Sequence, residues 1–183
     1  YRGVPETLSN VTVSFWSNHT NSGQVGCATV FSDNSSVSTN RFLVHFPCND
    51  GQLYWDFGAI GSGGRLQITW DSAWNSNWAF WTFQSEAGVG QKIWRNGVLI
   101  TSDATTSTFN LTGLVLNIGA GAGAFWKGQL DDFRIYNRTL STNEILLLND
   151  SKDSVIAFNE LKLNQLWTAC ITPNDGTSNG NTA

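Results

Sequence analysis

The sequence has little positive charge, and this limits the partners that the protein can bind. Only 10 of its 183 residues are Lys or Arg, against 14 Asp or Glu, which gives a formal net charge of −4. Nucleic-acid-binding domains need clusters of basic side chains to neutralise phosphates, so we expect no nucleic-acid partner. No apolar run approaches the roughly 20 residues of a membrane-spanning helix, so we also expect no membrane insertion.

Residues that commonly catalyse hydrolysis are scarce as well. The chain has only two His, His19 and His45, and four Glu. A glycoside hydrolase needs two carboxylates placed across the scissile bond. No Glu has an acidic partner two or three residues away on a predicted strand, and neither His suggests a Ser-His-Asp or Cys-His arrangement. We therefore expect that the protein is not an enzyme.

Large aromatic and turn-forming residues are abundant instead. The sequence contains nine Trp, 11 Phe and 18 Gly, together with many Ser, Thr and Asn, which favours a chain of strands joined by turns. Residues 10–17 alternate in character as a half-buried strand does, and Asn96-Gly97 is a strong hairpin signal. The pattern predicts an all-β fold, a two-sheet antiparallel jelly-roll sandwich, in a chain whose length suits one domain.

One short helix is predicted near the end of this region. Residues 130–136 alternate as a strand, and Ser141 with Glu144 has the spacing of a helix-capping box. The apolar residues 145–148 follow the cap. We expect the helix to cover one edge or end of a sheet.

The segment over residues 128–145, GQLDDFRIYNRTLSTNEI, also carries a family resemblance. It resembles the closing signature of the laminin-G-like branch of the concanavalin A-like lectin/glucanase superfamily. The residues that fall on this signature are Gly128, Asp131, Asp132, Arg134, Ile135, Tyr136, Asn137, Arg138, Leu140, Ser141, Glu144 and Ile145.

The resemblance extends over residues 11–150 and implies the jelly-roll fold for most of the chain. An earlier pair of strands also resembles the family through Trp78, Phe83, Ile93, Trp94, Asn96 and Gly97. We therefore divide the chain into a laminin-G-like domain over residues 1–150 and a C-terminal arm or tail over residues 151–183. The fold alone does not define the ligand, because it hosts many functions.

Two of the three Cys flank a predicted hairpin. A hairpin that is symmetric about residues 33–40 places Cys27 opposite Cys48, Thr29 opposite Phe46 and Phe31 opposite Val44. Opposed Cys can lie close enough for a disulfide, although two reduced Cys used as small core residues fit the pattern equally well. The redox state of the compartment decides between these alternatives.

Calcium is the one candidate cofactor. Many laminin-G-like relatives bind Ca²⁺ through loop oxygen atoms, and this resemblance makes Asp131 and Asp132 candidate ligands. The alternative is that one of these carboxylates pairs with Arg134 or Arg138 or accepts backbone N–H bonds. The sequence favours the alternative, because no segment has the dense Asp and Asn spacing of a calcium loop.

Several aromatic and polar residues are candidates for sugar binding. Lectin sites use an aromatic face for the apolar side of a sugar ring and amide or carboxylate groups for its hydroxyls. Asp71, Trp74 and Asn75 offer both in one loop, and Trp126 and Trp55 are further candidates. Trp74 is expected to be exposed, because it lies in the middle of the loop.

Most of the remaining Trp residues are expected in the core, including Trp16, Trp78 and Trp81. The sequence therefore predicts a non-catalytic binding module that recognises glycans on a cell or particle surface, as part of a virion, phage fibre or adhesin. The alternative is a structural assembly module of a virus particle or extracellular complex. Such a module would contact neighbouring chains or a surface protein through exposed aromatic residues and the C-terminal tail.

Overall fold

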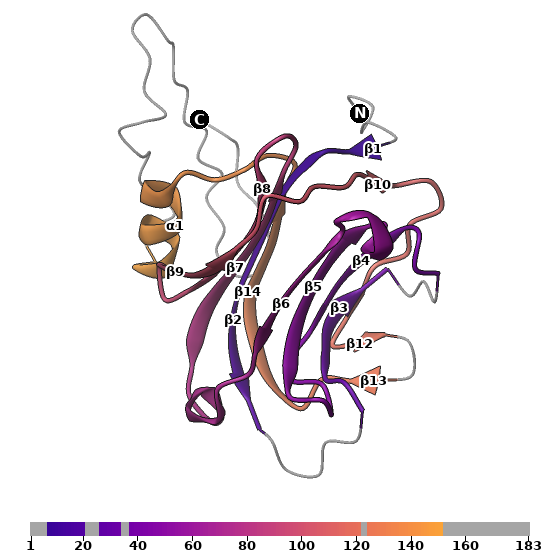
Figure 1. The fold of residues 1–183 in the computed structure, drawn as a ribbon. Helices are drawn as coiled ribbons and strands as arrows, with labels where there is room; N and C mark the ends of the chain where they lie inside the picture. The colour runs from indigo at the N-terminus through magenta and orange to yellow at the C-terminus, as the bar shows by residue number, and fades with distance from the viewer. Residues whose placement is uncertain (1–6, 21–25, 34–36, 122–123, 152–183) are drawn as a thin grey trace, which may run out of the picture.

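The computed structural model describes residues 7–20, 26–33, 37–121 and 124–151. Two five-stranded antiparallel sheets pack face to face (Figure 1), which confirms the predicted β-sandwich. We name the sheet with strand order β14-β2-β7-β8-β9 sheet I. The sheet with strand order β11-β3-β4-β5-β6 is sheet II.

The elements are short and closely spaced, as the turn-rich sequence predicts. Sheet I consists of β14 (Gly128–Tyr136), β2 (Asn10–His19), β7 (Ala79–Glu86), β8 (Gly90–Arg95) and β9 (Val98–Ser102). Sheet II consists of β11 (Asn117–Ile118), β3 (Thr29–Ser32), β4 (Arg41–His45), β5 (Gln52–Gly58) and β6 (Arg65–Thr69). The smaller elements are β1 (Thr7–Leu8), β10 (Phe109–Asn110), β12 (Ala120–Gly121), β13 (Ala124–Phe125), the 3₁₀ turns η1 (Ile60–Ser62) and η2 (Ser72–Trp74), and the helix α1 (Thr142–Asn149).

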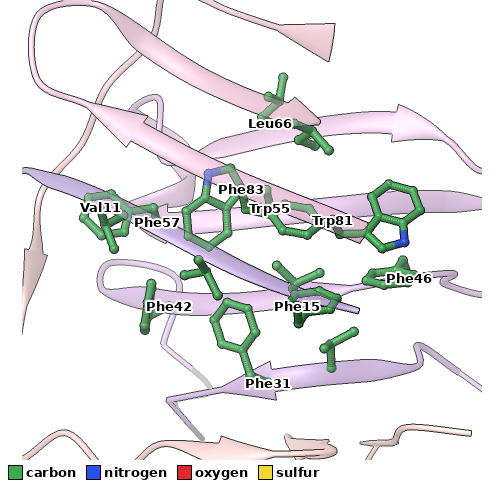
Figure 2. Close-up of a cluster of buried hydrophobic side chains, with 14 of the residues drawn as sticks. Val11, Phe15, Phe31, Phe42, Phe46, Trp55, Phe57, Leu66, Trp81 and Phe83 are labelled. Carbon is green, nitrogen blue, oxygen red and sulfur yellow. The ribbon is translucent and has the colours of Figure 1, made fainter. Parts of the chain in front are cut away.

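The hydrophobic core fills the space between the two sheets. Phe15 of β2, Trp55 of β5 and Phe83 of β7 are all fully buried and lie in one aromatic cluster (Figure 2). Burying each such side chain contributes about 2–3 kcal/mol. The indole Nε1 of Trp55 donates a hydrogen bond to the backbone oxygen of Gln84 at 3.0 Å, so this buried donor also links sheet II to sheet I.

A disulfide joins Cys27 to Cys48 beside the β3–β4 hairpin, which decides between the two alternatives that the sequence left open. Phe31 lies opposite Val44 as predicted, but Thr29 pairs with His45 and not with Phe46. The reason is a register shift between Thr29 and Phe31, which a symmetric hairpin does not anticipate. A structural disulfide is typical of proteins in oxidising compartments.

The helix α1 covers the outer face of sheet I (Figure 1), and the expectation that it covers an edge or end of a sheet is wrong. Phe80 of β7 projects from this face and forms a small apolar cluster with Leu140, Ile145 and Leu148. The predicted capping box is present. The Ser141 hydroxyl accepts from the N–H of Glu144 at 3.3 Å, and the Glu144 carboxylate accepts from the N–H of Ser141 at 2.7 Å.

The Asn96-Gly97 hairpin between β8 and β9 is also confirmed, and it packs against the helix. Both residues have positive φ, as this two-residue turn requires. A Cβ atom at Gly97 would lie 2.6 Å from Cδ2 of Leu146, so the absence of a side chain allows the turn to approach α1 closely.

The tail predicted over residues 151–183 lies outside the described residues except for Ser151, so its role stays a prediction. Within the described ranges, no helix has both the length and the apolar character needed to cross a bilayer.

Candidate functional site

A pocket of about 350 Å³ opens on the outer face of sheet I. Trp16, Trp78, Asp131, Asp132 and Ser151 line it, and we name it the Trp16–Trp78 pocket. The pairing of β2 with β14 brings its two sides together, because Asp131 lies opposite Trp16 in the ladder. The site therefore depends on contacts between residues that are more than 100 positions apart in the sequence.

Both Trp residues of this pocket were predicted to lie in the core, but neither is fully buried. Trp78 directly precedes β7 and its side chain is 45% exposed, so the prediction of a buried Trp78 is wrong. Trp16 is half-buried, with one part against Phe80 at a ring distance of 5.5 Å and another part lining the pocket. The predicted burial of Trp81 is confirmed, since it is only 2% exposed.

The two carboxylates of the pocket lie on a bulge in β14. The register shifts between Asp131 and Arg134, and Asp132 has a φ of 55° within this bulge. One oxygen of Asp131 accepts from the N–H of Asp132 at 2.8 Å. Asp132 accepts from Nη2 of Arg134 at 2.8 Å in an exposed ion pair. Both residues stay exposed, so they can still offer oxygen atoms to a ligand.

The predicted role of these carboxylates as metal ligands gains no support from their surroundings. Over the described residues, no group of three or more His, Cys, Asp or Glu side chains could hold an ion. Asp131 and Asp132 instead take the alternative that the sequence favoured, a backbone N–H bond and a pairing with Arg134. Two adjacent carboxylates alone supply fewer than the six to eight oxygen ligands that Ca²⁺ takes, so its binding here stays a prediction.

The predicted loop residues 71–75 shortly precede Trp78 in the sequence, and they are engaged in contacts within the loop. Asp71 caps η2 by accepting from the N–H of Ala73 at 2.9 Å, and Asn75 accepts from Nε1 of Trp70 at 3.2 Å. Trp74 is half-buried and not exposed as expected. Its ring contacts Trp70 at 5.1 Å.

The side chain of Arg95 also packs against this loop, over the rings of Trp74 and Trp81. The guanidinium carbon of Arg95 is 5.5 Å from the Trp74 ring and 5.7 Å from the Trp81 ring. Burial lowers the pKa of Arg95, and Asp71 partly offsets this effect. These contacts hold the loop that precedes Trp78 against the end of the core.

Trp126 packs at the same end of the sandwich, beside His19 and Phe46, with ring distances of 4.9 and 5.1 Å. Its indole Nε1 is buried and has no hydrogen-bond partner among the described residues, and the same is true of Nε2 of His19. Nδ1 of His19 lies 3.1 Å from the backbone oxygen of Lys127. Burial lowers the pKa of His19, which favours the neutral ring, although the hydrogen bond to Lys127 opposes this shift.

Trp55 is not part of this site. It is fully buried in the core, so a ligand cannot reach it, and the prediction that it binds one is wrong. The neighbouring Asp56 is also fully buried, and it pairs with Arg41 at 3.2 Å and with Arg65 at 2.6 Å on the outer face of sheet II.

Sequence reasoning therefore singled out Asp131 and Asp132, whose role as metal ligands stays a prediction, and it missed Trp16 and Trp78 as surface residues. A signal for Trp16 was present. It has the same phase in β2 as the polar residues Thr12 and Ser14, whereas Val11, Val13 and Phe15 have the opposite phase and form the core.

Comparison with known proteins agrees with this architecture. The model of the concanavalin A-like lectin/glucanases superfamily matches residues 4–146. Among curated proteins, no significant match to the sequence was found.

Solved structures with a similar fold include receptor-binding domains of botulinum neurotoxins. The serotype D binding domain has a TM-score of 0.60 at 15% identity over 82% of this chain and 38% of its own chain. The C/D mosaic receptor-binding domain has a TM-score of 0.56 at 17% identity over 79% of this chain and 37% of its own. The chain thus spans less than two fifths of these structures, and at such low identity the likeness shows the fold.

Proposed function

Because the chain belongs to the concanavalin A-like lectin/glucanase superfamily, we propose that it is a non-catalytic carbohydrate-binding module. The observation that carries the proposal is the Trp16–Trp78 pocket, in which a 45% exposed indole and a half-buried one lie beside two exposed carboxylates. The indoles contact the apolar face of a sugar ring, and the carboxylates accept hydrogen bonds from its hydroxyls.

The charge of the pocket supports a preference for neutral glycans. Two carboxylates are among the described residues that line the pocket, whereas no Lys or Arg is. The nearby Arg134 is held by Asp132 in the ion pair described above. A sugar that carries its own carboxylate therefore meets repulsion, because no Lys or Arg among the described lining residues compensates it.

We assign supporting roles to the loop residues. Asp71, Trp74 and Asn75 position the loop that precedes Trp78, through the η2 cap and the contacts with Trp70. Trp126 packs beside His19 and Phe46 at the adjoining end of the sandwich, and we assign it a supporting role there.

Binding without catalysis is supported by the arrangement of the carboxylates. A glycosidase places its two carboxyl groups on opposite sides of the scissile bond, and one of them must act as an acid. Asp131 and Asp132 are adjacent residues of one bulge, and Asp132 is paired with Arg134. Adjacent carboxylates cannot flank a scissile bond from opposite sides, and a carboxylate that is paired with Arg134 is poorly suited to act as the acid.

An extracellular setting is part of the proposal. The Cys27–Cys48 disulfide supports an oxidising compartment. One similar structure comes from botulinum neurotoxin type C, whose cell entry depends on interaction with two ganglioside molecules. That structure has a TM-score of 0.54 at 17% identity. Recognition of surface glycans by an adhesin or a particle surface protein is consistent with this setting.

A glycan array tests the proposal directly. The full chain is expected to bind neutral glycans, and the Trp78→Ala variant is expected to lose most of that signal. Phe125→Ala is the matched control, because Phe125 is 66% exposed but lies on β13, away from the pocket. An array with no signal for the intact chain, or equal signals for the two variants, contradicts the proposal. Release of reducing sugar from a bound glycan contradicts its non-catalytic part.

The second candidate function, a structural assembly module, is favoured by one observation. Val115, Ile118 and Phe125 are 65%, 53% and 66% exposed, and Ile118 belongs to the edge strand β11 of sheet II. Exposed apolar residues near a sheet edge suit contact with another chain. Light scattering tests this alternative. An oligomer that dissociates in an Ile118→Lys variant, together with no glycan binding, would favour assembly.

A further inference from the structure

A second pocket of about 360 Å³ lies elsewhere on the outer face of sheet I. It is formed by β7, β8 and the segment that leads into α1, and its lining includes Glu86, Lys92, Trp94, Thr139 and Thr142. The Trp16–Trp78 pocket includes Ser151, which follows the C-terminal end of the helix. The two pockets therefore flank α1, whose eight residues span about 12 Å.

The indole of this second pocket is fixed by its neighbours. Nε1 of Trp94 donates to the side-chain oxygen of Gln84 at 2.9 Å, and the Gln84 amide nitrogen donates to the backbone oxygen of Leu140 at 2.8 Å. Trp94 also packs against the apolar cluster beneath α1. A rigid, half-buried indole thus lines the pocket, as Trp16 lines the first one.

Charged groups that the fold does not use lie beside this indole. Glu86 and Lys92 are both partly exposed and form no ion pair or side-chain hydrogen bond in the described part of the chain. Glu144 differs from them, because it is occupied by the helix cap and by Arg138 at 2.5 Å. Lys92 therefore provides an unused donor and Glu86 an unused acceptor, with the Thr139 and Thr142 hydroxyls also in the lining.

We propose that this second pocket binds a neutral sugar unit, so that the domain has two carbohydrate sites on the same face, one at each end of α1. Sugar hydroxyls both donate and accept, which suits a lining that holds Lys92 and Glu86 together. The opposite charges of these two groups balance, so the lining does not select an anionic sugar. The inference rests on the proposed function, since it assigns a second site to the same ligand class.

Calorimetric titration with a small neutral oligosaccharide chosen from the array tests the second site. The oligosaccharide must be too short to span the helix. We expect two equivalents per chain, with one lost in the Glu86→Gln/Lys92→Gln double variant and the other lost in Trp78→Ala. Gln67→Ala is the control, because Gln67 is exposed on sheet II. The indole N–H signals of Trp94 and Trp78 in nuclear magnetic resonance spectra report each site separately.

The outcomes separate the two proposals. If one equivalent binds, is lost in Trp78→Ala and is unchanged in the double variant, the second site is overturned and the first is retained. If no equivalent binds to any variant, the proposed function itself fails. Binding of a uronic acid at the Trp94 site at least tenfold more tightly than the neutral sugar contradicts the neutral preference.

Discussion

The outer faces of the two sheets use their polar residues in opposite ways. On sheet II, Asp56 is fully buried between Arg41 and Arg65, and the Tyr54 hydroxyl donates to Asp50 at 2.5 Å. On sheet I, the polar and aromatic groups at the two ends of α1 face pockets instead. The difference indicates that the groups of sheet II stabilise the fold, whereas the pocket groups of sheet I are available to a ligand.

The largest change in the free energy of unfolding is predicted for the removal of the Asp56 carboxylate. An Asp56→Ala variant leaves two Arg side chains without their shared partner, and breaking such a buried pair costs about 3–5 kcal/mol. Urea denaturation measures the change in the free energy of unfolding. Glu86→Gln on sheet I is the control, with an expected change within about 0.5 kcal/mol because the Glu86 side chain pairs with no other residue in the described ranges. Equal losses in the two variants would remove the distinction between the faces.

Removal of the disulfide beside the β3–β4 hairpin of sheet II is predicted to cause the next largest loss of stability. Replacing Cys27 and Cys48 together by Ala removes a cross-link between residues 21 positions apart. The expected loss is about 3 kcal/mol in the free energy of unfolding, because the unfolded chain gains freedom. Glycan binding by the folded fraction is expected to stay unchanged, since neither Cys lines a pocket of sheet I. A variant that keeps its stability but loses binding would show that the two faces are coupled.

His45 gives the sheet II network a pH dependence. Its ring contacts Thr29 at 2.9 Å, and burial lowers its pKa from 6.5 to about 4. The charge of Asp56 opposes this shift, and those of Arg41 and Arg65 add to it. The folded state thus disfavours the proton relative to the unfolded chain, so stability is present above pH 6.5 and is lost as the pH falls toward 4.

The loss attributable to His45 is about 3 kcal/mol between these two pH values. Urea denaturation at pH 7 and pH 4 measures it in the parent chain and in His45→Gln. The variant is expected to lose less stability over this range. His19 contributes with the same sign, because burial also lowers its pKa, and it is unchanged in the variant. Parallel pH curves for the two proteins would show that His45 is not the cause.

Local patterns in the sequence were sufficient for much of the fold. The alternation of Val11, Val13 and Phe15 predicted β2 and its buried face, and the spacing of Ser141 and Glu144 predicted the start of α1. These features depend on residues within a few positions of each other. The place of α1 on the face of sheet I depends on Phe80, which is distant in sequence, and was not predicted.

The candidate site was predicted less well for the same reason. Its carboxylates meet Trp16 only through the pairing of β2 with β14, and a bulge turns Asp131 and Asp132 toward the pocket. Trp78 lies just before its strand, where alternation assigns no face. The error for Trp55 was avoidable, because it alternates with Leu53 and Phe57 in phase with the core.

The smallest predicted change is in the free energy of glycan binding by Trp78→Ala, and measuring it tests the central claim most directly. A titration of the chain with its best neutral glycan compares the affinities of the parent, Trp78→Ala and Phe125→Ala, after unfolding curves have shown that all three are equally folded. Removing an indole that contacts the sugar should weaken binding at least tenfold, or about 1.4 kcal/mol, whereas Phe125→Ala should bind as the parent does. An unchanged affinity in Trp78→Ala would contradict the claim that this pocket of sheet I is the glycan site.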